Sequence, residues 1–428
     1  MQNKKSLTLR ILSGLALGAI TGIAVSYLPD HQGAVFTGLN SLFDLVGGLF
    51  INSIRMLVVP LVFVSLFCGV TNLGDIARIG RIGARTMAFY LITTAIAISL
   101  ALCVSIIIQP GAGLNMAELT KQAPDIANRQ SMIQTLQNII PTNPIAAMAE
   151  GNMLQIIFVA LLSGVSASLL GARARPVIDF CDSANAIVMN MVMLLMHIAP
   201  YGVFALIART FAATGLDAMV PLIKYVVTVL FVLLLHMCLV YMGALKLIGR
   251  LNPFRFFRNF LPAMSVAFST ASSNGTLPIS IETVETRCGV ANSIASFTMP
   301  LGATINMDGT AIMQGVAVVF IAQVYGIDLP LNAFLTVILT ATLASVGTAG
   351  VPGVGLITLS MVLESVNLPV EGIALIIGVD RLLDMTRTVV NITGDAVCTI
   401  LIAKSEGKFN AEVYDSENSE KISSDSAA

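Results

Sequence analysis

The residues with the greatest chemical potential lie near the end of the chain, in the segment Asp380–Asp395. If this segment is a helix, which turns by about 100° per residue, its polar members share one stripe roughly 100° wide. Those members are Asp380, Asp384, Arg387, Thr388, Asn391 and Asp395. The leucines and valines between them lie away from the stripe. A charge in an apolar helix is costly, so the stripe should face a hydrated or protein-lined pocket. A purely structural network of salt bridges is the alternative.

The charges of this stripe match the groups of an amino acid. Asp384 offers an anion to an ammonium group, and Arg387 offers a planar fork of donors to a carboxylate. Thr310, Asn391 and the backbone amide near Ser273 supply further donors for the main carboxylate. A neutral amino acid would leave Arg387 buried without a partner, which costs several kcal/mol. The pattern therefore favours aspartate or glutamate.

A second set of residues suits a hard cation such as sodium. Hard cations prefer oxygen ligands, and unwound backbone at membrane depth is a usual source of carbonyl oxygens. The side chains of Asp308, Asp395 and Asn306 could supply such oxygens. Candidate carbonyls belong to Gly302, Thr304, Ser345 and Asn391.

The composition places these residues in a membrane protein. The chain has 428 residues, of which 56% are hydrophobic and 11% charged, against about 25% charged in a typical soluble protein. Its net charge of −1 gives no basic field for nucleic acid. Six stretches approach the roughly 20 apolar residues that cross a bilayer. We predict spans at Ile11–Leu28, Val46–Asn72, Thr86–Ile108, Met153–Leu170, Ala184–Ile207 and Tyr225–Leu245.

Basic residues set the orientation. With the N-terminus in the cytoplasm, most of the lysines and arginines fall in cytoplasmic loops, as the positive-inside rule requires. The same count puts the C-terminus inside. Gln109–Gly151 is expected to form a long external loop, and the acidic segment Ser405–Ala428 a disordered tail.

The second half of the chain contains two interrupted apolar segments, Ser269–Pro278 and Ser345–Gly355. Non-helical backbone survives at membrane depth only when protein or a cavity surrounds it, so we predict two re-entrant helical hairpins. Small residues also serve close helix packing, which is the alternative. Each tip precedes a helix with Asn, Asp and Gly, at Pro300–Thr310 and Asn391–Asp395. The duplication suggests an internal repeat of the kind found in secondary transporters.

These segments resemble the glutamate transporter family, the dicarboxylate/amino acid:cation symporters. The matching stretches come in family order across almost the whole chain. They are Arg55–Pro60, Tyr90–Thr94, Ser272–Pro278, Asn306–Thr310, Gly347–Gly353 and Asp384–Asp395.

The resemblance implies an all-α membrane protein with eight transmembrane helices and two re-entrant hairpins. It implies a homotrimer in the cell (inner) membrane that takes up glutamate or aspartate with two or three sodium ions. Each protomer would hold a scaffold, and a transport domain that slides as an elevator. The scaffold would be residues 9–75 and 143–212, the transport domain 84–110 and 217–404, and the disordered cytoplasmic tail 405–428.

The resemblance also assigns residues by position. The substrate residues would be Ser273, Thr310, Val351, Gly355, Asp384, Arg387, Thr388 and Asn391. A first sodium site would use Gly302, Asn306, Asn391 and Asp395. A second would use Tyr90, Thr93, Thr94, Asn306 and Asp308. A third would use Thr304, Ser345, Val346 and Thr348.

One departure affects specificity. Similar proteins carry an arginine at the position of Ala271 or of Met385, and this chain has neither. Arg381 lies four residues before Met385, one helical turn away. Our hypothesis is that Arg381 supplies the missing charge beside Asp384.

Several alternatives remain open at this stage. Within the family these are proton coupling, and C4-dicarboxylates or neutral amino acids as substrates. An intramembrane aspartyl protease needs a Gly-x-Gly-Asp motif, but Ile392 stands where the first glycine is required. The three histidines form no HExxH motif, and His197 and His236 are expected to serve helix packing. A channel is the remaining rival.

Overall fold

The computed structural model describes residues 7–28, 33–72, 81–114, 139–346 and 350–416. Within these ranges the chain is helical, and one isolated antiparallel bridge pairs Val290 with Phe409. Six helical stretches among the described residues are long and apolar enough to cross a membrane. They are Leu9–Ser26, Ala34–Thr71, Arg81–Ile108, Met153–Asp217, Met219–Ile248 and Asn292–Val324. The chain is therefore a multi-pass membrane protein.

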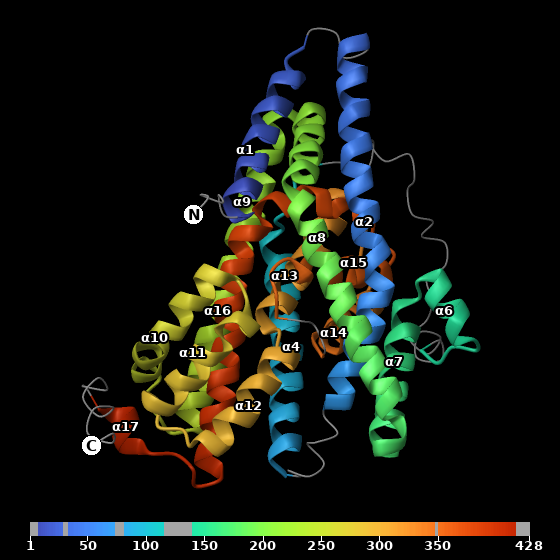
Figure 1. Cartoon of the computed structure of the whole chain (residues 1–428). Coiled ribbons are helices and arrows are strands. Elements are labelled where there is room, and N and C mark those ends of the chain that lie inside the picture. Colours follow the sequence, from blue (N-terminus) through green and yellow to red (C-terminus); the bar gives the residue numbers. More distant parts are fainter. Residues whose placement is uncertain (1–6, 29–32, 73–80, 115–138, 347–349, 417–428) are drawn as a thin grey trace, which may run out of the picture.

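One group of helices runs along the long axis of the molecule (Figure 1). It contains α1 (Leu7–Ser26), α2 (Ala34–Asn72), α7 (Met153–Leu170) and α8 (Arg175–Thr214). Helix α8 packs against α1 and α2, and α7 packs against α2. Gly14, Gly18 and Gly22 explain the closeness of α1 and α8, because a Cβ at any of them would lie within 2.6 Å of a backbone oxygen of α8. The short helix α6 (Pro144–Glu150) precedes α7, and a 3₁₀ turn, Gly171–Ala174, joins α7 to α8.

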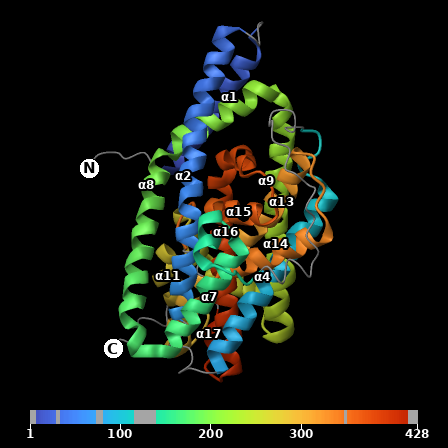
Figure 2. The ribbon, with the colours of Figure 1, turned by 90° about the vertical axis from the view of Figure 1, so that its right-hand side faces the viewer.

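A second group of helices packs around α13 (Asp308–Val324), which lies near the middle of the ribbon in Figure 1 and close to α9 (Met219–His236) and α14 (Leu331–Ser345) in Figure 2. Helix α13 packs against several of the others, and the most apolar window of Asn292–Val324 is completely buried. The other members are α4 (Arg81–Ile108), α9, α10 (Pro253–Thr270), α11 (Ser273–Thr286), α12 (Asn292–Ile305), α14, α15 (Val354–Ser365) and α16 (Ile373–Ser405). Two π-helical turns, Met237–Tyr241 and Ala244–Ile248, extend α9, and 3₁₀ turns at Gly215–Ala218 and Val370–Gly372 precede α9 and α16.

The two interrupted segments form helix pairs whose tips meet. Helix α10 packs against α11, and α14 against α15. Ser272 begins α11 by accepting the Gly275 N–H at 3.0 Å. Its hydroxyl also donates to the Gly350 carbonyl of the other tip at 2.7 Å, and the Asn274 N–H donates to the same oxygen at 3.2 Å. The predicted helix–tip–helix pattern is thus present, although residues 347–349 lie outside the described ranges.

The helix predicted through Pro300–Thr310 is not continuous. Helix α12 ends at Ile305 and α13 begins at Asp308, and Asn306 and Met307 between them have non-helical backbone angles. The expectation of one helix was wrong because the apolar periodicity continues across the break. Unwinding at this point leaves polar backbone groups beside the Asp308 side chain.

The expectation of disorder from residue 405 was wrong for residues 405–416; residues 417–428 lie outside the described ranges. Residues 404–416, here called the clasp, contain α17 (Ala411–Asp415) and lie beside α10 (Figure 1). Several of their interactions are made with backbone groups of the segment just before α10 and of the α11–α12 turn. Lys404 Nζ donates to the Gly249 carbonyl at 2.7 Å, Asn410 N to Gly289 O at 2.7 Å, and Tyr414 OH to Asn252 O at 2.9 Å. Asp415 pairs with Arg255, and Glu406 with Arg81 and Arg85.

We predict that Tyr414→Ala destabilises the protein by about 3 kcal/mol, the usual cost of deleting a buried aromatic side chain. Tyr414 is 0% exposed. The measurement is the denaturant dependence of unfolding in detergent. Tyr201→Ala is the matched control, because Tyr201 is 71% exposed. Equal effects of the two substitutions would show that the clasp contributes nothing to stability.

Candidate functional site

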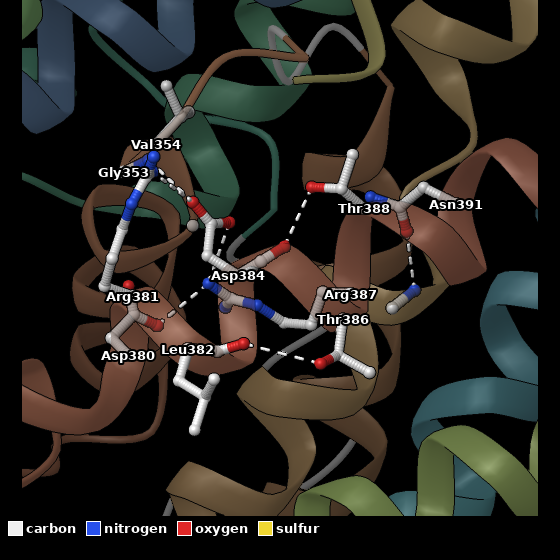
Figure 3. Close-up of polar contacts among 12 residues, drawn as sticks. Gly353, Val354, Asp380, Arg381, Leu382, Asp384, Thr386, Arg387, Thr388 and Asn391 are labelled. Atoms are coloured by element: carbon white, nitrogen blue, oxygen red, sulfur yellow. Dashed lines mark hydrogen bonds and ion pairs between the residues drawn. The ribbon is translucent and has the colours of Figure 1, made fainter. Parts of the chain in front are cut away.

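The polar stripe predicted on the last long helix exists, and α16 buries all six of its members. At its centre the Arg387 guanidinium is fully buried. Its Nη2 donates to Asp380 Oδ1 at 2.8 Å and to Asp384 Oδ1 at 3.0 Å (Figure 3). We had expected Asp384 and Arg387 to hold opposite groups of a bound molecule; here they pair with each other. A buried charge needs such a partner, which the neighbouring carboxylates supply.

The rest of the guanidinium remains available. Arg387 Nε and Nη1 are buried and have no hydrogen-bond partner among the described residues. Nη1 faces the first turn of α15, where a Cβ on Gly355 would lie 3.0 Å from it. One of these two donors, Nη1, therefore lies directly against the second hairpin. Buried donors of this kind are costly unless a ligand or water accepts from them.

The second tip reaches the same carboxylate from the other side. Asp384 Oδ2 accepts the Gly353 N–H at 3.3 Å and lies 3.5 Å from Arg381 Nη1 (Figure 3). Beside it is a cavity of about 60 Å³ between α1, α8, α16 and the tip. Its lining includes Met193 and Met196 of α8 as well as Asp380, Arg381 and Asp384.

The other predicted substrate residues surround this centre to different degrees. Asn391 Oδ1 accepts the Gly309 N–H at 2.7 Å, which fixes α16 against the start of α13 near Thr310. The Thr388 hydroxyl donates to the Asp384 backbone carbonyl at 2.8 Å, within its own helix. Ser273 is buried at the start of α11, next to the second tip. Val351 lies in that tip and is partly buried.

The first predicted sodium set is brought together. Asn306 Nδ2 donates to Asp395 Oδ1 at 2.9 Å and to the Asn391 carbonyl at 3.1 Å. Gly302 lies against them, since a Cβ there would be 2.4 Å from Asp395 Oδ1 and 2.6 Å from Tyr90 OH. Asn306 Oδ1 is buried without a partner among the described residues. This corner is therefore rich in oxygens and closed to larger side chains.

The second predicted set centres on Asp308. Thr94 Oγ1 donates to Asp308 Oδ1 at 2.6 Å, whereas the Thr93 hydroxyl donates to the Tyr90 carbonyl at 3.2 Å. Sequence reasoning missed two neighbours, His236 and Tyr241, which both contact Asp308 Oδ2. His236 was expected to serve helix packing; it is buried between α9 and α13, and it also contacts the Asp308 carboxylate. No local sequence pattern predicts these two contacts, because 67 residues or more separate the partners along the chain.

Among the described residues, no contact brings the third predicted set together. The Thr304 hydroxyl donates to the Pro300 carbonyl and the Ser345 hydroxyl to the Thr342 carbonyl, each within its own helix. Val346 follows the end of α14, and Thr348 lies outside the described residues. This set stays a prediction.

The charge balance differs between the two parts of the site. Around Arg387 two carboxylates face two guanidinium groups. Asp308 and Asp395 are also buried, but among the described residues neither is paired with a lysine or arginine. Buried carboxylates without a cationic side chain are typical of a site that binds a cation.

Known proteins match this chain over almost its whole length. The sequence profile of the Sodium:dicarboxylate symporter family matches residues 7–405. The chain is 39% identical over 423 residues to a proton/glutamate-aspartate symporter of Escherichia coli, covering 96% of this chain and 95% of that protein. It is 35% identical to a proton/sodium-glutamate symport protein of Geobacillus stearothermophilus, covering 96% of each. It is 31% identical to a C4-dicarboxylate transport protein of Bacillus subtilis, covering 95% of each. On the strength of a match that includes both hairpin tips and the whole polar stripe, the chain belongs to the sodium:dicarboxylate symporter family.

Proposed function

We propose that this protein is a secondary active transporter that takes up acidic amino acids, L-glutamate or L-aspartate, together with sodium. The observation that carries the proposal is the fully buried Arg387, beside Asp384, whose Nε and Nη1 have no hydrogen-bond partner among the described residues. A substrate carboxylate would accept from those nitrogens, and its ammonium would pair with Asp384. Thr310, Thr388, Asn391, Ser273, Val351 and Gly355 complete the proposed binding site.

Sodium coupling is supported by the buried oxygens at Asp308 and Asp395. Sodium would bind to the first two predicted sets, and to the third if Thr304 and Ser345 reorient. Binding of the cation would offset the carboxylate charges, and substrate and ions would then cross together. Proton coupling and C4-dicarboxylate transport are the two alternatives, because relatives of this chain bear those names.

We propose further that movement follows the elevator scheme. The packing supports this, because α1, α2, α7 and α8 form one group, while α4 and α9–α16 form another around α13. The first group would be the scaffold of a homotrimer in the cell (inner) membrane, and the second would slide against it. Both termini would be cytoplasmic, as the distribution of basic residues favours.

Arg381 is proposed to tune the substrate site through Asp384, 3.5 Å away. Arg381→Ala should therefore weaken uptake several-fold without abolishing it, because the contact is long and partly exposed. Unchanged uptake would show that Arg381 does not replace the family's missing arginine.

The decisive experiment is radiolabelled uptake into proteoliposomes, with sodium, proton and potential gradients imposed one at a time. A sodium gradient should drive glutamate or aspartate above equilibrium, and unlabelled acidic amino acids should compete. Accumulation driven by protons without sodium would establish proton coupling instead. Stronger competition by succinate or malate would indicate a C4-dicarboxylate carrier, and uptake without accumulation would indicate a channel.

A further inference from the structure

The Asp308 carboxylate has two partners on α9 and its extension that the proposed transport site does not include. His236 Nε2 lies 3.1 Å from Asp308 Oδ2, and Tyr241 OH donates to the same oxygen at 2.8 Å. The two rings meet edge to face with centroids 4.8 Å apart. All three side chains are 0% exposed. The carboxylate is therefore held by a rigid aromatic pair.

The backbone conformation between His236 and Tyr241 brings the two side chains together. His236 and Tyr241 are five residues apart, which in an α-helix would leave their side chains about 140° apart. The Met242 N–H, however, donates to the Met237 carbonyl five residues earlier, so Met237–Tyr241 is a π-helical turn. The extra residue in the wider turn brings Tyr241 back onto the face of His236. Such turns are rare and frequently occur at functional sites.

The hydrogen bonds fix how the carboxylate points. Since Tyr241 and His236 donate to Oδ2, and Thr94 donates to Oδ1 at 2.6 Å, Asp308 cannot rotate without breaking three bonds. The second ring nitrogen of His236, Nδ1, is buried and has no partner among the described residues. With Nδ1 unbonded, the contact of Nε2 with Asp308 is what orients the imidazole.

We propose that His236 and Tyr241 are positioning residues for the sodium ion at Asp308. They hold Oδ2 on the α9 side of the carboxylate, which leaves Oδ1 directed toward α4. There Tyr90, Thr93 and Thr94 would supply further oxygens. The inference rests on the proposed sodium coupling. Outer partners that orient a metal-binding side chain typically contribute about 10–100-fold to affinity.

The test measures sodium binding apart from transport. Purified protein is unfolded thermally in detergent without amino acid, followed by circular dichroism, while NaCl replaces choline chloride at constant ionic strength. Bound sodium raises stability according to its concentration and dissociation constant. We expect His236→Leu and Tyr241→Phe each to raise the half-saturating sodium concentration about tenfold or more. His236→Gln keeps an N–H donor and should stay within about threefold of the wild type.

Tyr414→Phe is the matched control, because it also removes a buried tyrosine hydrogen bond, but in the clasp. It should lower stability without changing the sodium dependence. If Tyr241→Phe and His236→Gln both keep the wild-type sodium dependence and His236→Leu does so or fails to fold, the inference is overturned. An equal shift in Tyr414→Phe would overturn it too.

Asp308→Asn separates this inference from the proposed function. Loss of sodium stabilisation in Asp308→Asn, with normal sodium dependence in the His236 and Tyr241 variants, would leave the cation site standing and remove only the positioning role. A wild-type protein that sodium does not stabilise would contradict the sodium site itself, and the inference with it.

Discussion

Arg387→Ala should weaken binding of glutamate and aspartate by about two to three orders of magnitude and abolish their uptake. The substitution removes the proposed carboxylate donor and leaves Asp380 and Asp384 buried without their shared cation. Truncating one partner of a buried charge pair costs about 2–5 kcal/mol, and each 1.4 kcal/mol is about tenfold in affinity. Isothermal titration of the purified protein measures the loss directly.

Two further arginine variants sharpen this prediction. Arg387→Lys keeps the charge but not the planar fork, so affinity should fall to an intermediate value. Arg381→Ala removes a cation from the same carboxylate cluster at a partly exposed position, and should cost less than about tenfold. Retention of near-normal affinity by Arg387→Ala, or a larger loss in Arg381→Ala, would contradict the role given to Arg387.

Gly309→Ala should abolish uptake even though alanine is the better helix former. A Cβ at Gly309 would lie 2.5 Å from the Arg387 carbonyl oxygen and 3.0 Å from Asn391 Oδ1. The oxygen belongs to backbone, so α13 and α16 would have to separate, which breaks the 2.7 Å bond from Gly309 N to Asn391. Overpacking costs about 1–3 kcal/mol, against a propensity gain of about 1 kcal/mol.

The control for this prediction is Gly48→Ala. Gly48 is also within a helix, α2, but a Cβ there meets nothing within 4 Å. It should leave uptake unchanged and slightly raise the unfolding midpoint. Normal transport by Gly309→Ala in the same proteoliposome assay would show that the contact between α13 and α16 tolerates expansion.

Much of the fold follows from local pattern. Met153–Leu170 was predicted with the bounds that α7 has, because that apolar run is delimited by Asn152 and Gly171. Helices α2 and α8 extend beyond their predicted spans, because helical turns that contain polar residues, such as Asp44 in α2 and Asp179 in α8, lie outside the apolar windows. The stripe on α16 was correct because helical periodicity alone brings Asp380, Arg387 and Asp395 to one side.

The rest depends on contacts between distant segments. Sequence spacing does not reveal that Arg387 pairs with both Asp380 and Asp384. An arginine in this stripe could equally point its guanidinium toward a bound molecule. His236 reaches Asp308 only through the packing of α9 on α13. Tyr241 reaches it only through a π-helical turn that no residue type signals. The order in residues 405–416 was missed because a segment of polar composition is held by contacts with distant residues, among them those of the buried Tyr414.

Every residue of α13 except Gln323 is buried, and this burial has a consequence for biogenesis. A helix with no lipid-facing side cannot reach its final surroundings when it leaves the ribosome, because α14, α15 and α16 have not yet been synthesised. It must wait beside α4 and α9 until the C-terminal quarter of the chain arrives. Chains shortened within α16 should therefore be substrates for membrane quality-control proteases, even though every segment before the truncation has been inserted.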